Sequence, residues 1–236
     1  MKTIIHKANE RGTAEFGWLH SRHSFSFGRY YNPEKMGFGL LRVLNDDIVE
    51  PGEGFGKHPH DNMEIISIVL DGELEHKDST GTGSVIKAGD VQVMSAGSGI
   101  THSEFNHSNE KKVNFLQLWI IPNERNIKPR YDQKYFSPEE RKNKIKTVVS
   151  GIEPETVLSI HQNAAISLGN FEKGKEVNYK IKYPGNGAYL FILNGNVKLN
   201  SDTIAGRDAI GITDAEDFSF HTESDTVLVI IDVPMK

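Results

Sequence analysis

Turn signals that recur about every ten residues constrain the fold of this 236-residue chain most strongly. Glycine occurs 22 times, and short β-type runs lie between the turns. Few segments repeat apolar residues with the 3.6-residue period of a helix. Short strands at regular spacing favour an all-β sandwich or barrel over alternating βαβ units. The runs expected to form strands are 39–49, 65–70, 91–94, 113–121, 189–193 and 227–233.

A polar and charged segment from Pro122 to about Lys144 is expected to act as a linker between two β-rich halves. Within it, Ser137 is followed by Pro138 and, three residues after the serine, by Glu140. This is the capping-box pattern with proline at the first helical position. It predicts one short helix inside the linker.

The two halves share an order of local signals. An Asp-Gly turn at 71–72 and an Asn-Gly turn at 194–195 each follow an apolar run, and each half ends in an apolar strand closed by proline. Hairpin turns reuse the same residues, but shared order and spacing favour a duplicated β-domain. We predict an amino-terminal metal-binding domain of residues 1–135 and a carboxyl-terminal domain of residues 136–236 without a metal site.

Composition excludes several classes of function. The 27 basic and 32 acidic residues give a net charge of −5, and no basic run is present, so we expect no direct binding to nucleic acid. The chain has no cysteine, which excludes disulfides and thiol chemistry. No apolar signal segment or membrane-length apolar run is visible, so the expected location is cytoplasmic and no membrane partner is expected.

Two pairs of metal-ligand side chains carry the chemical signal. His58 and His60 follow a glycine-rich segment, and His102 and Glu104 follow another about forty residues later. Residues at i and i+2 of a strand point to the same face, and Pro59 favours the extended backbone at His58. Two such strands side by side would bring three imidazoles and one carboxylate together. These donors suit a divalent ion such as Fe, Mn, Ni, Cu or Zn.

Other histidines and aromatic residues have simpler interpretations. His221 and Glu223 repeat the spacing without a second pair nearby, and we expect a solvated strand end or a relic of duplication. His20 and His23 are not expected to be ligands. The residues expected to be solvated are His76 and His161, and those expected to lie in the core rather than against a substrate are Phe25, Phe27, Tyr30 and Tyr31.

Several segments together resemble the pirin family of bicupins, most closely its bacterial quercetinase members. They are HSFSFGRYY at 23–31, LRVLNDD at 41–47, GKHPHD at 56–61 and MSAGSGITHSE at 94–104. The resemblance extends over essentially the whole chain. It implies two cupin domains in tandem, each a jelly-roll barrel or double-stranded β-helix. It also implies a bound metal ion.

The resemblance also bears on the identity of the carboxylate ligand. In the general cupin pattern, Gly52, His58 and His60 fit, and Glu64 fits the acidic position under the shorter spacing. In the pirin family the carboxylate follows the third histidine by two residues, which is Glu104 here. The implied ligands are therefore His58, His60, His102 and Glu104. Glu64 is expected to be an exposed strand residue, with a hydrogen bond to a ligand histidine as the alternative.

The activity implied by this resemblance is that of a metal-dependent quercetin 2,3-dioxygenase. Such an enzyme opens the central ring of a flavonol with O2 and releases carbon monoxide. Glu104 would act as the catalytic base, and Fe(II) is the favoured ion, with Mn, Co, Ni, Cu and Zn as alternatives. Some pirins resemble regulators, so the second hypothesis is a non-enzymatic metal-binding module that binds a protein partner.

Overall fold

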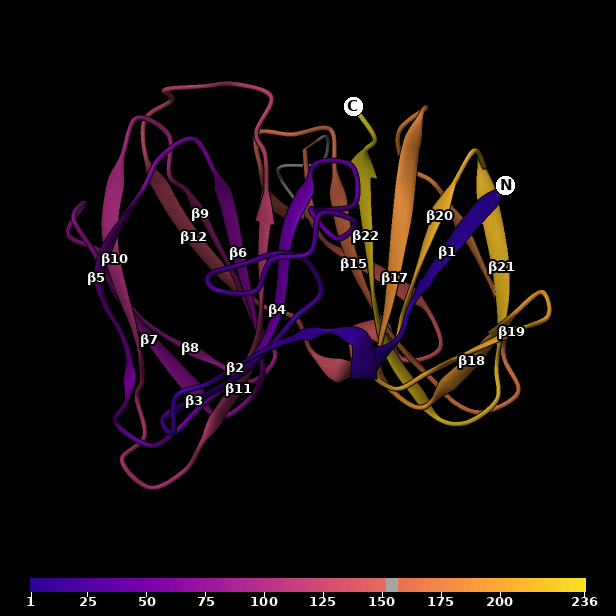
Figure 1. The fold of residues 1–236 in the computed structure, drawn as a ribbon, viewed down its shortest axis with the longest axis horizontal. Helices are drawn as coiled ribbons and strands as arrows, with labels where there is room; N and C mark the ends of the chain where they lie inside the picture. The colour runs from indigo at the N-terminus through magenta and orange to yellow at the C-terminus, as the bar shows by residue number, and fades with distance from the viewer. Residues whose placement is uncertain (152–156) are drawn as a thin grey trace.

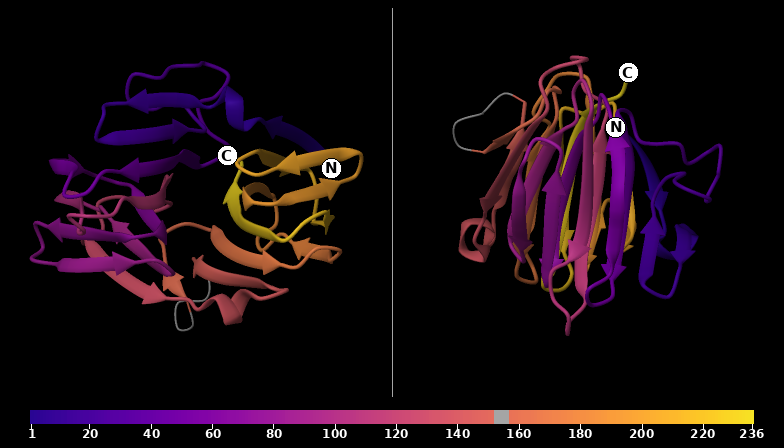
Figure 2. Two further views of the ribbon diagram at one scale, coloured as in Figure 1. Left: turned by 90° about the horizontal axis from the view of Figure 1, so that it is seen from below. Right: turned by 90° about the vertical axis from the view of Figure 1, so that its left-hand side faces the viewer.

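The computed structural model describes residues 1–151 and 157–236 and contains two β-barrels that lie side by side (Figure 1). Each barrel is built from one seven-stranded and one four-stranded sheet, and among the strands that the structure describes the pairing is antiparallel except between two strands of the second barrel. Figure 2 shows the same two barrels from below and from the left. The all-β prediction is confirmed. Within the described residues, no helix has the length and hydrophobicity to cross a bilayer.

In the amino-terminal barrel the seven-stranded sheet has the order β12 (Arg130–Tyr135), β9 (Asp90–Ser95), β6 (Glu64–Asp71), β11 (Val113–Ile120), β4 (Leu41–Val49), β3 (Leu19–His23) and β2 (Gly12–Glu15). The four-stranded sheet has the order β5 (Gly54–His60), β10 (Ile100–Asn106), β7 (Glu73–Asp78) and β8 (Gly83–Lys87).

In the carboxyl-terminal barrel the seven-stranded sheet has the order β1 (Lys2–His6), β20 (Ala209–Thr213), β17 (Asn186–Asn194), β22 (Thr226–Pro234), β15 (Ala165–Phe171), β13 (Ile145–Ser150) and β14 (Leu158–Ser159). The four-stranded sheet has the order β16 (Glu176–Lys180), β21 (Asp217–Thr222), β18 (Asn196–Leu199) and β19 (Asp202–Ala205).

The first strand crosses to the far barrel. β1 pairs antiparallel with β20, from Lys2 opposite Thr213 to His6 opposite Ala209, and Figure 1 shows it in indigo beside the yellow carboxyl-terminal strands. The imidazole Nδ1 of His6 also lies 2.9 Å from the hydroxyl of Tyr189. The two ends of the chain therefore contribute to one sheet. The division between residues 135 and 136 stays a prediction.

Some strands are apolar on both faces because the two large sheets pack against each other. On β11, Phe115 faces the interior of its own barrel, whereas Leu116 and Leu118 join the cluster shared by the two barrels. On β17, Leu190 packs inside the second barrel and Phe191 packs in the shared cluster. Alternate side chains of a strand point to opposite faces, so a strand buried on both sides reads as a continuous apolar run.

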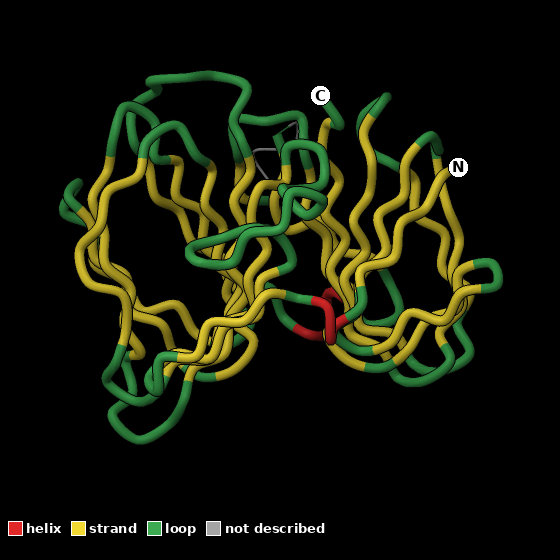
Figure 3. Tube along the Cα trace, viewed as in Figure 1, coloured by secondary structure: helices red, strands yellow, loops and turns green. Residues whose placement is uncertain are grey.

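The segment predicted as a linker is partly strand. The predicted helix is present as a 3-10 helix, η2 (Pro138–Arg141), and the backbone N–H of Ser137 donates to the Glu140 carboxylate at 2.8 Å. A second 3-10 helix, η1 (Ala8–Glu10), follows β1, and both are drawn in red in Figure 3. However, β12 lies inside the supposed linker and pairs with β9. Its polar sequence is that of a sheet-edge strand.

Candidate metal centre

Two neighbouring strands of the small amino-terminal sheet carry the predicted ligands. His58 and His60 lie on β5, and His102 and Glu104 lie on β10, with His58 directly opposite His102 in the antiparallel register. The register shifts between His102 and Glu104. Gly97 before β10 has a φ of 50°, and a Cβ there would lie 2.1 Å from the Ile127 carbonyl oxygen. The backbone at position 97, just before β10, therefore requires glycine.

The three predicted histidines form one cluster. Their ring centroids are 4.4 Å apart for His58 and His102, 4.8 Å for His58 and His60, and 4.9 Å for His60 and His102. A ring nitrogen of each lies within 4.8 Å of the others. The Nε2 atoms of His58 and His102 are 3.0 Å apart. Two nitrogens bound at right angles to one ion at about 2.1 Å would be about 3.0 Å apart.

The tautomer of His58 fits a metal ligand. Its Nδ1 lies 2.7 Å from the carbonyl oxygen of Gly56. A carbonyl can only accept, so Nδ1 carries the proton and donates it, which leaves a lone pair on Nε2. A backbone carbonyl that fixes the other ring nitrogen is a common partner of metal-binding histidines. The lone pair of His58 therefore points at the ring of His102.

Burial keeps the imidazoles of His60 and His102 neutral. Burial, followed by the neighbouring His102 and His58 rings, lowers the pKa of His60 to about 4. Burial, followed by the rings of His58 and His76, lowers the pKa of His102 to about 3. Only a neutral imidazole has a lone pair for a metal ion, and metal binding must otherwise displace a proton. At neutral pH His60 and His102 can therefore bind a cation without that competition.

Glu104 is buried and tightly held. Its Oε1 accepts a hydrogen bond from Ser67 Oγ at 3.2 Å, and its Oε2 accepts one from Gln117 Nε2 at 2.8 Å. Its ligand oxygen groups within 4.8 Å with His76 and His102. The four-ligand set of His58, His60, His102 and Glu104 stays a prediction. In the described part of the chain, both groups of potential metal ligands belong to the amino-terminal barrel.

A cavity of about 440 Å³ opens beside the cluster. His58, His60 and Glu104 form part of its wall. The aromatic residues that line it are Phe16, Phe27, Tyr30, Phe55 and Trp119. The indole of Trp119 packs edge-on against the His60 ring at 4.9 Å. The cavity can therefore hold a flat apolar molecule next to the histidines.

The aromatic run at 25–31 was interpreted wrongly in part. Phe25 is a core residue, as predicted, but Phe27 and Tyr30 line the cavity and Tyr31 is 73% exposed. Phe27 and Tyr30 lie in a loop, where they form an isolated bridge rather than part of a strand. The path of the loop therefore determines which of these aromatic side chains face the cavity. Alternation alone gave no way to separate core positions from cavity positions.

Two residues predicted to be exposed are buried. The side chain of His76 is completely buried, with its Nε2 2.9 Å from Asp78 Oδ2. Glu64 is 1% exposed and accepts a hydrogen bond from Ser95 Oγ at 2.7 Å. Burial raises the pKa of Glu64 to about 7. His76 and Asp78 have the same i, i+2 spacing as the recognised pairs, so a signal for them was present in the sequence.

A further carboxyl group in the cavity wall had no sequence signal of its own. Asp47 lies on β4, is 3% exposed and accepts a hydrogen bond from Ser21 Oγ. Burial raises its pKa to about 7, with the charges of Asp46 and Glu104 acting in the same direction. The cavity thus contains two buried carboxyl groups in different hydrogen-bonding environments.

Two tandem barrels with a histidine cluster in the wall of a cavity in the first define a bicupin with a centre suited to a metal ion. A family model described as Pirin matches residues 5–120, and one described as Quercetinase C-terminal cupin domain matches residues 147–233. The chain belongs to the pirin family, and the predicted pair of cupin domains is confirmed.

Known proteins resemble the chain over nearly its whole length. A quercetin 2,3-dioxygenase of Escherichia coli strain K12 is 40% identical over 230 residues, which cover 98% of each chain. A pirin-like protein of Caulobacter vibrioides is 38% identical over 222 residues, 94% of this chain and 95% of that one. The bacterial pirin YhhW from Escherichia coli, solved in complex with nickel(II), superposes with a TM-score of 0.93 at 39% identity and 99% coverage of both chains.

Proposed function

We propose that this protein is a metal-dependent dioxygenase of the quercetin 2,3-dioxygenase type. The observation that supports this most strongly is the position of the histidine cluster beside an aromatic cavity, with His58 and His60 in the cavity wall. The relatives named quercetin 2,3-dioxygenase make a flavonol the first substrate to test. O2 would be consumed and carbon monoxide released as the central ring of the flavonol opens.

His58, His60, His102 and Glu104 would hold one divalent ion, and Fe(II) is the first choice. Imidazole and carboxylate donors accept several first-row ions, so the donor set alone does not select among Fe, Mn, Co, Ni, Cu and Zn. When bound, the ion would lower the pKa of a coordinated hydroxyl group and stabilise its anion. The fixed tautomer of His58 and the neutral rings of His60 and His102 prepare the site for it.

Glu104 is the proposed base that receives the proton of the flavonol 3-hydroxyl group. Glu104 forms part of the cavity wall, and its two oxygens accept hydrogen bonds from Ser67 and Gln117. These donors fix the carboxylate in one orientation, which a base needs in order to meet one particular hydroxyl. Gln117 also lines the cavity, so it can hold the carboxylate from the substrate side.

The aromatic wall would position the substrate and exclude water. The rings of Phe27 and Trp119 pack edge to face with centroids 5.3 Å apart, which makes this part of the wall rigid. A flat flavonol buried against such a wall would lose most of its hydration. A water-poor site protects the electron-rich anion from protonation by solvent.

The test is reconstitution of metal-free protein with each candidate ion. The protein is loaded separately with Fe(II), Mn(II), Co(II), Ni(II), Cu(II) or Zn(II), and quercetin absorbance and carbon monoxide are followed under oxygen. We expect oxygen-dependent loss of quercetin with at least one ion and equal release of carbon monoxide. Failure with every ion, in protein that binds the ions, would overturn the enzymatic proposal and favour the metal-binding module with a protein partner.

A further inference from the structure

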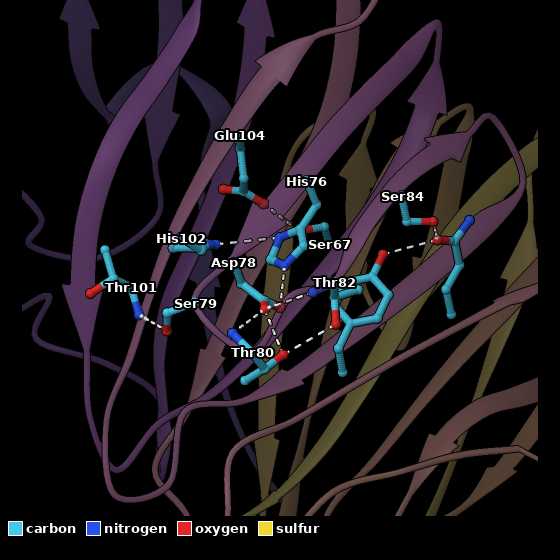
Figure 4. Close-up of polar contacts among 12 residues, drawn as sticks. Ser67, His76, Asp78, Ser79, Thr80, Thr82, Ser84, Thr101, His102 and Glu104 are labelled. Carbon is cyan, nitrogen blue, oxygen red and sulfur yellow. Dashed lines mark hydrogen bonds and ion pairs between the residues drawn. The ribbon is translucent and has the colours of Figure 1, made fainter.

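We propose that Asp78 and His76 are positioning residues that hold His102 in the tautomer whose Nε2 is free for the metal ion. The inference rests on the proposed function only through the assignment of His102 as a ligand. The three side chains form a chain of contacts that runs from Asp78 through His76 to His102 (Figure 4).

The strand register places these residues on one face. β7 pairs antiparallel with β10, with Asp78 opposite His102 and His76 opposite Glu104. Each strand contributes residues at i and i+2, so all four side chains point to the same side of the sheet. The backbone N–H of Ser79 donates to the Thr101 carbonyl at 2.8 Å, which ties the end of β7 to the strand that carries His102.

Asp78 is held as a hydrogen-bond acceptor on both oxygens. Its Oδ1 accepts from the backbone N–H and the hydroxyl of Thr80, at 2.8 and 2.6 Å, and from the backbone N–H of Thr82 at 3.3 Å. Its Oδ2 lies 2.9 Å from Nε2 of His76, and both side chains are completely buried. An ionised carboxylate can only accept, so Nε2 of His76 carries the proton.

The proton position on His76 favours one tautomer of His102. A neutral imidazole with a proton on Nε2 has a lone pair on Nδ1. Nδ1 of His76 lies 3.5 Å from Nδ1 of His102, at the outer limit of a hydrogen bond. His102 can satisfy this contact only as a donor from Nδ1, which leaves its own lone pair on Nε2. That atom lies 3.0 Å from Nε2 of His58.

Stacking fixes the plane of the intermediate ring. The ring of Tyr131, on β12, lies 4.6 Å from the His76 ring at an angle of 30°. Its hydroxyl donates to Gln133 Oε1 at 2.9 Å, and Ser84 Oγ donates to the same oxygen at 2.7 Å. The imidazole of His76 therefore has little freedom to rotate, and a rigid partner is what a positioning role requires.

The competing interpretation is a second ion bound by His76, His102 and Glu104, whose ligand atoms also lie within 4.8 Å of one another. In that case Nδ1 of His102 would be a metal ligand and could not carry a proton. The number of ions per chain separates the two interpretations.

The first experiment needs no variant. Nitrogen-15 NMR of histidine side chains in the metal-free protein reports which ring nitrogen carries the proton. We expect the proton on Nδ1 of His102 and on Nε2 of His76, and after zinc is added we expect one zinc ion per chain with the proton still on Nδ1 of His102. A proton on Nε2 of His102 in the metal-free protein, or two zinc ions per chain, would overturn the proposal.

The second experiment measures the zinc dissociation constant of folded variants, checked by circular dichroism. Asp78→Asn lets an amide N–H face His76 and reverse its tautomer, and His76→Phe removes the acceptor for His102. Each is expected to weaken zinc binding by about 10- to 100-fold, the usual effect of losing a partner of a ligand histidine. His76→Gln, which restores an acceptor oxygen, is expected to recover part of the affinity.

Lys77 provides the matched control because its exposed side chain lies between the two positions and pairs with Glu75. Lys77→Gln should bind zinc like the wild type. Wild-type affinity in both Asp78→Asn and His76→Phe would overturn the positioning role. Tight zinc binding by the wild type without quercetin turnover would refute the proposed activity and leave the positioning role standing. A wild type that binds no zinc would overturn both.

Discussion

His58 and His102 lie directly opposite each other on β5 and β10, with their Nε2 atoms 3.0 Å apart. The Gly56 carbonyl fixes a lone pair on Nε2 of His58. The chain through His76 and Asp78 assigns a lone pair to Nε2 of His102. Two lone pairs at this distance repel each other, and a cation between them would remove the repulsion, so the geometry suits a bound metal ion.

Removal of either ring should therefore abolish tight metal binding. We expect His58→Ala and His102→Ala each to reduce bound zinc from one ion per chain to near zero, measured by elemental analysis after dialysis. His107→Ala is the control, since this histidine is exposed and directly follows β10, the strand that carries His102. Unchanged zinc content in either of the first two variants would contradict the ligand assignment.

Glu104→Gln should separate metal binding from catalysis. The amide keeps the size of the side chain but cannot take a proton, and it would present an N–H group to the donor Ser67 or Gln117. We expect the variant to retain part of its metal and to lose about 10²- to 10⁴-fold in turnover, the range for a general base. Glu110→Gln, at an exposed position, is the control. Full activity of Glu104→Gln would remove the base from the mechanism.

Asp47 should make the metal-free protein less stable as pH rises. Its folded-state pKa of about 7 lies above the ordinary value of 3.8, chiefly because of burial. The fold therefore favours the protonated acid, so stability is fully present below pH 3.8 and is lost as pH rises through about 7. In Asp47→Asn the side chain cannot titrate, so this variant does not lose stability in this way.

Urea unfolding at pH 5 and pH 8 measures this difference. Relative to the wild type, Asp47→Asn should gain about 2–3 kcal/mol in its free energy of unfolding between the two pH values. Asp132→Asn is the control because Asp132 is exposed on β12. A pH profile of Asp47→Asn parallel to that of the wild type would show that the buried carboxyl does not titrate in this window.

Gly12→Ala should disturb the substrate cavity without touching the metal ligands. A Cβ at Gly12 would lie 2.2 Å from Cγ of Tyr30, so the tyrosine ring must leave its place in the cavity wall. We expect the KM for quercetin to rise several-fold while the zinc dissociation constant is unchanged. Gly83→Ala is the control, since its nearest neighbour would be Lys77 Cγ at 3.9 Å. An unchanged KM would show that Tyr30 does not contact the substrate.

Local spacing in the sequence predicts the histidine cluster and several of the strands, but not β12, which lies in the segment expected to be a linker. The i, i+2 pairs at His58 and His102 need only an extended backbone to point the right way. The pair His76 and Asp78 carries the same spacing signal, but its contact with His102 depends on β7 being the neighbour of β10, which local spacing does not reveal. For the same reason, Asp47 and Glu64 carried no sign that they are buried carboxyl groups.

The most direct test of the metal centre is the anomalous diffraction of crystals of the protein loaded with zinc. We predict one strong peak per chain, about 2.0–2.2 Å from Nε2 of His58, Nε2 of His102, a ring nitrogen of His60 and a carboxylate oxygen of Glu104. A peak bound by Nδ1 of His76, or density that leaves His58 and His102 without a shared ion, would contradict it.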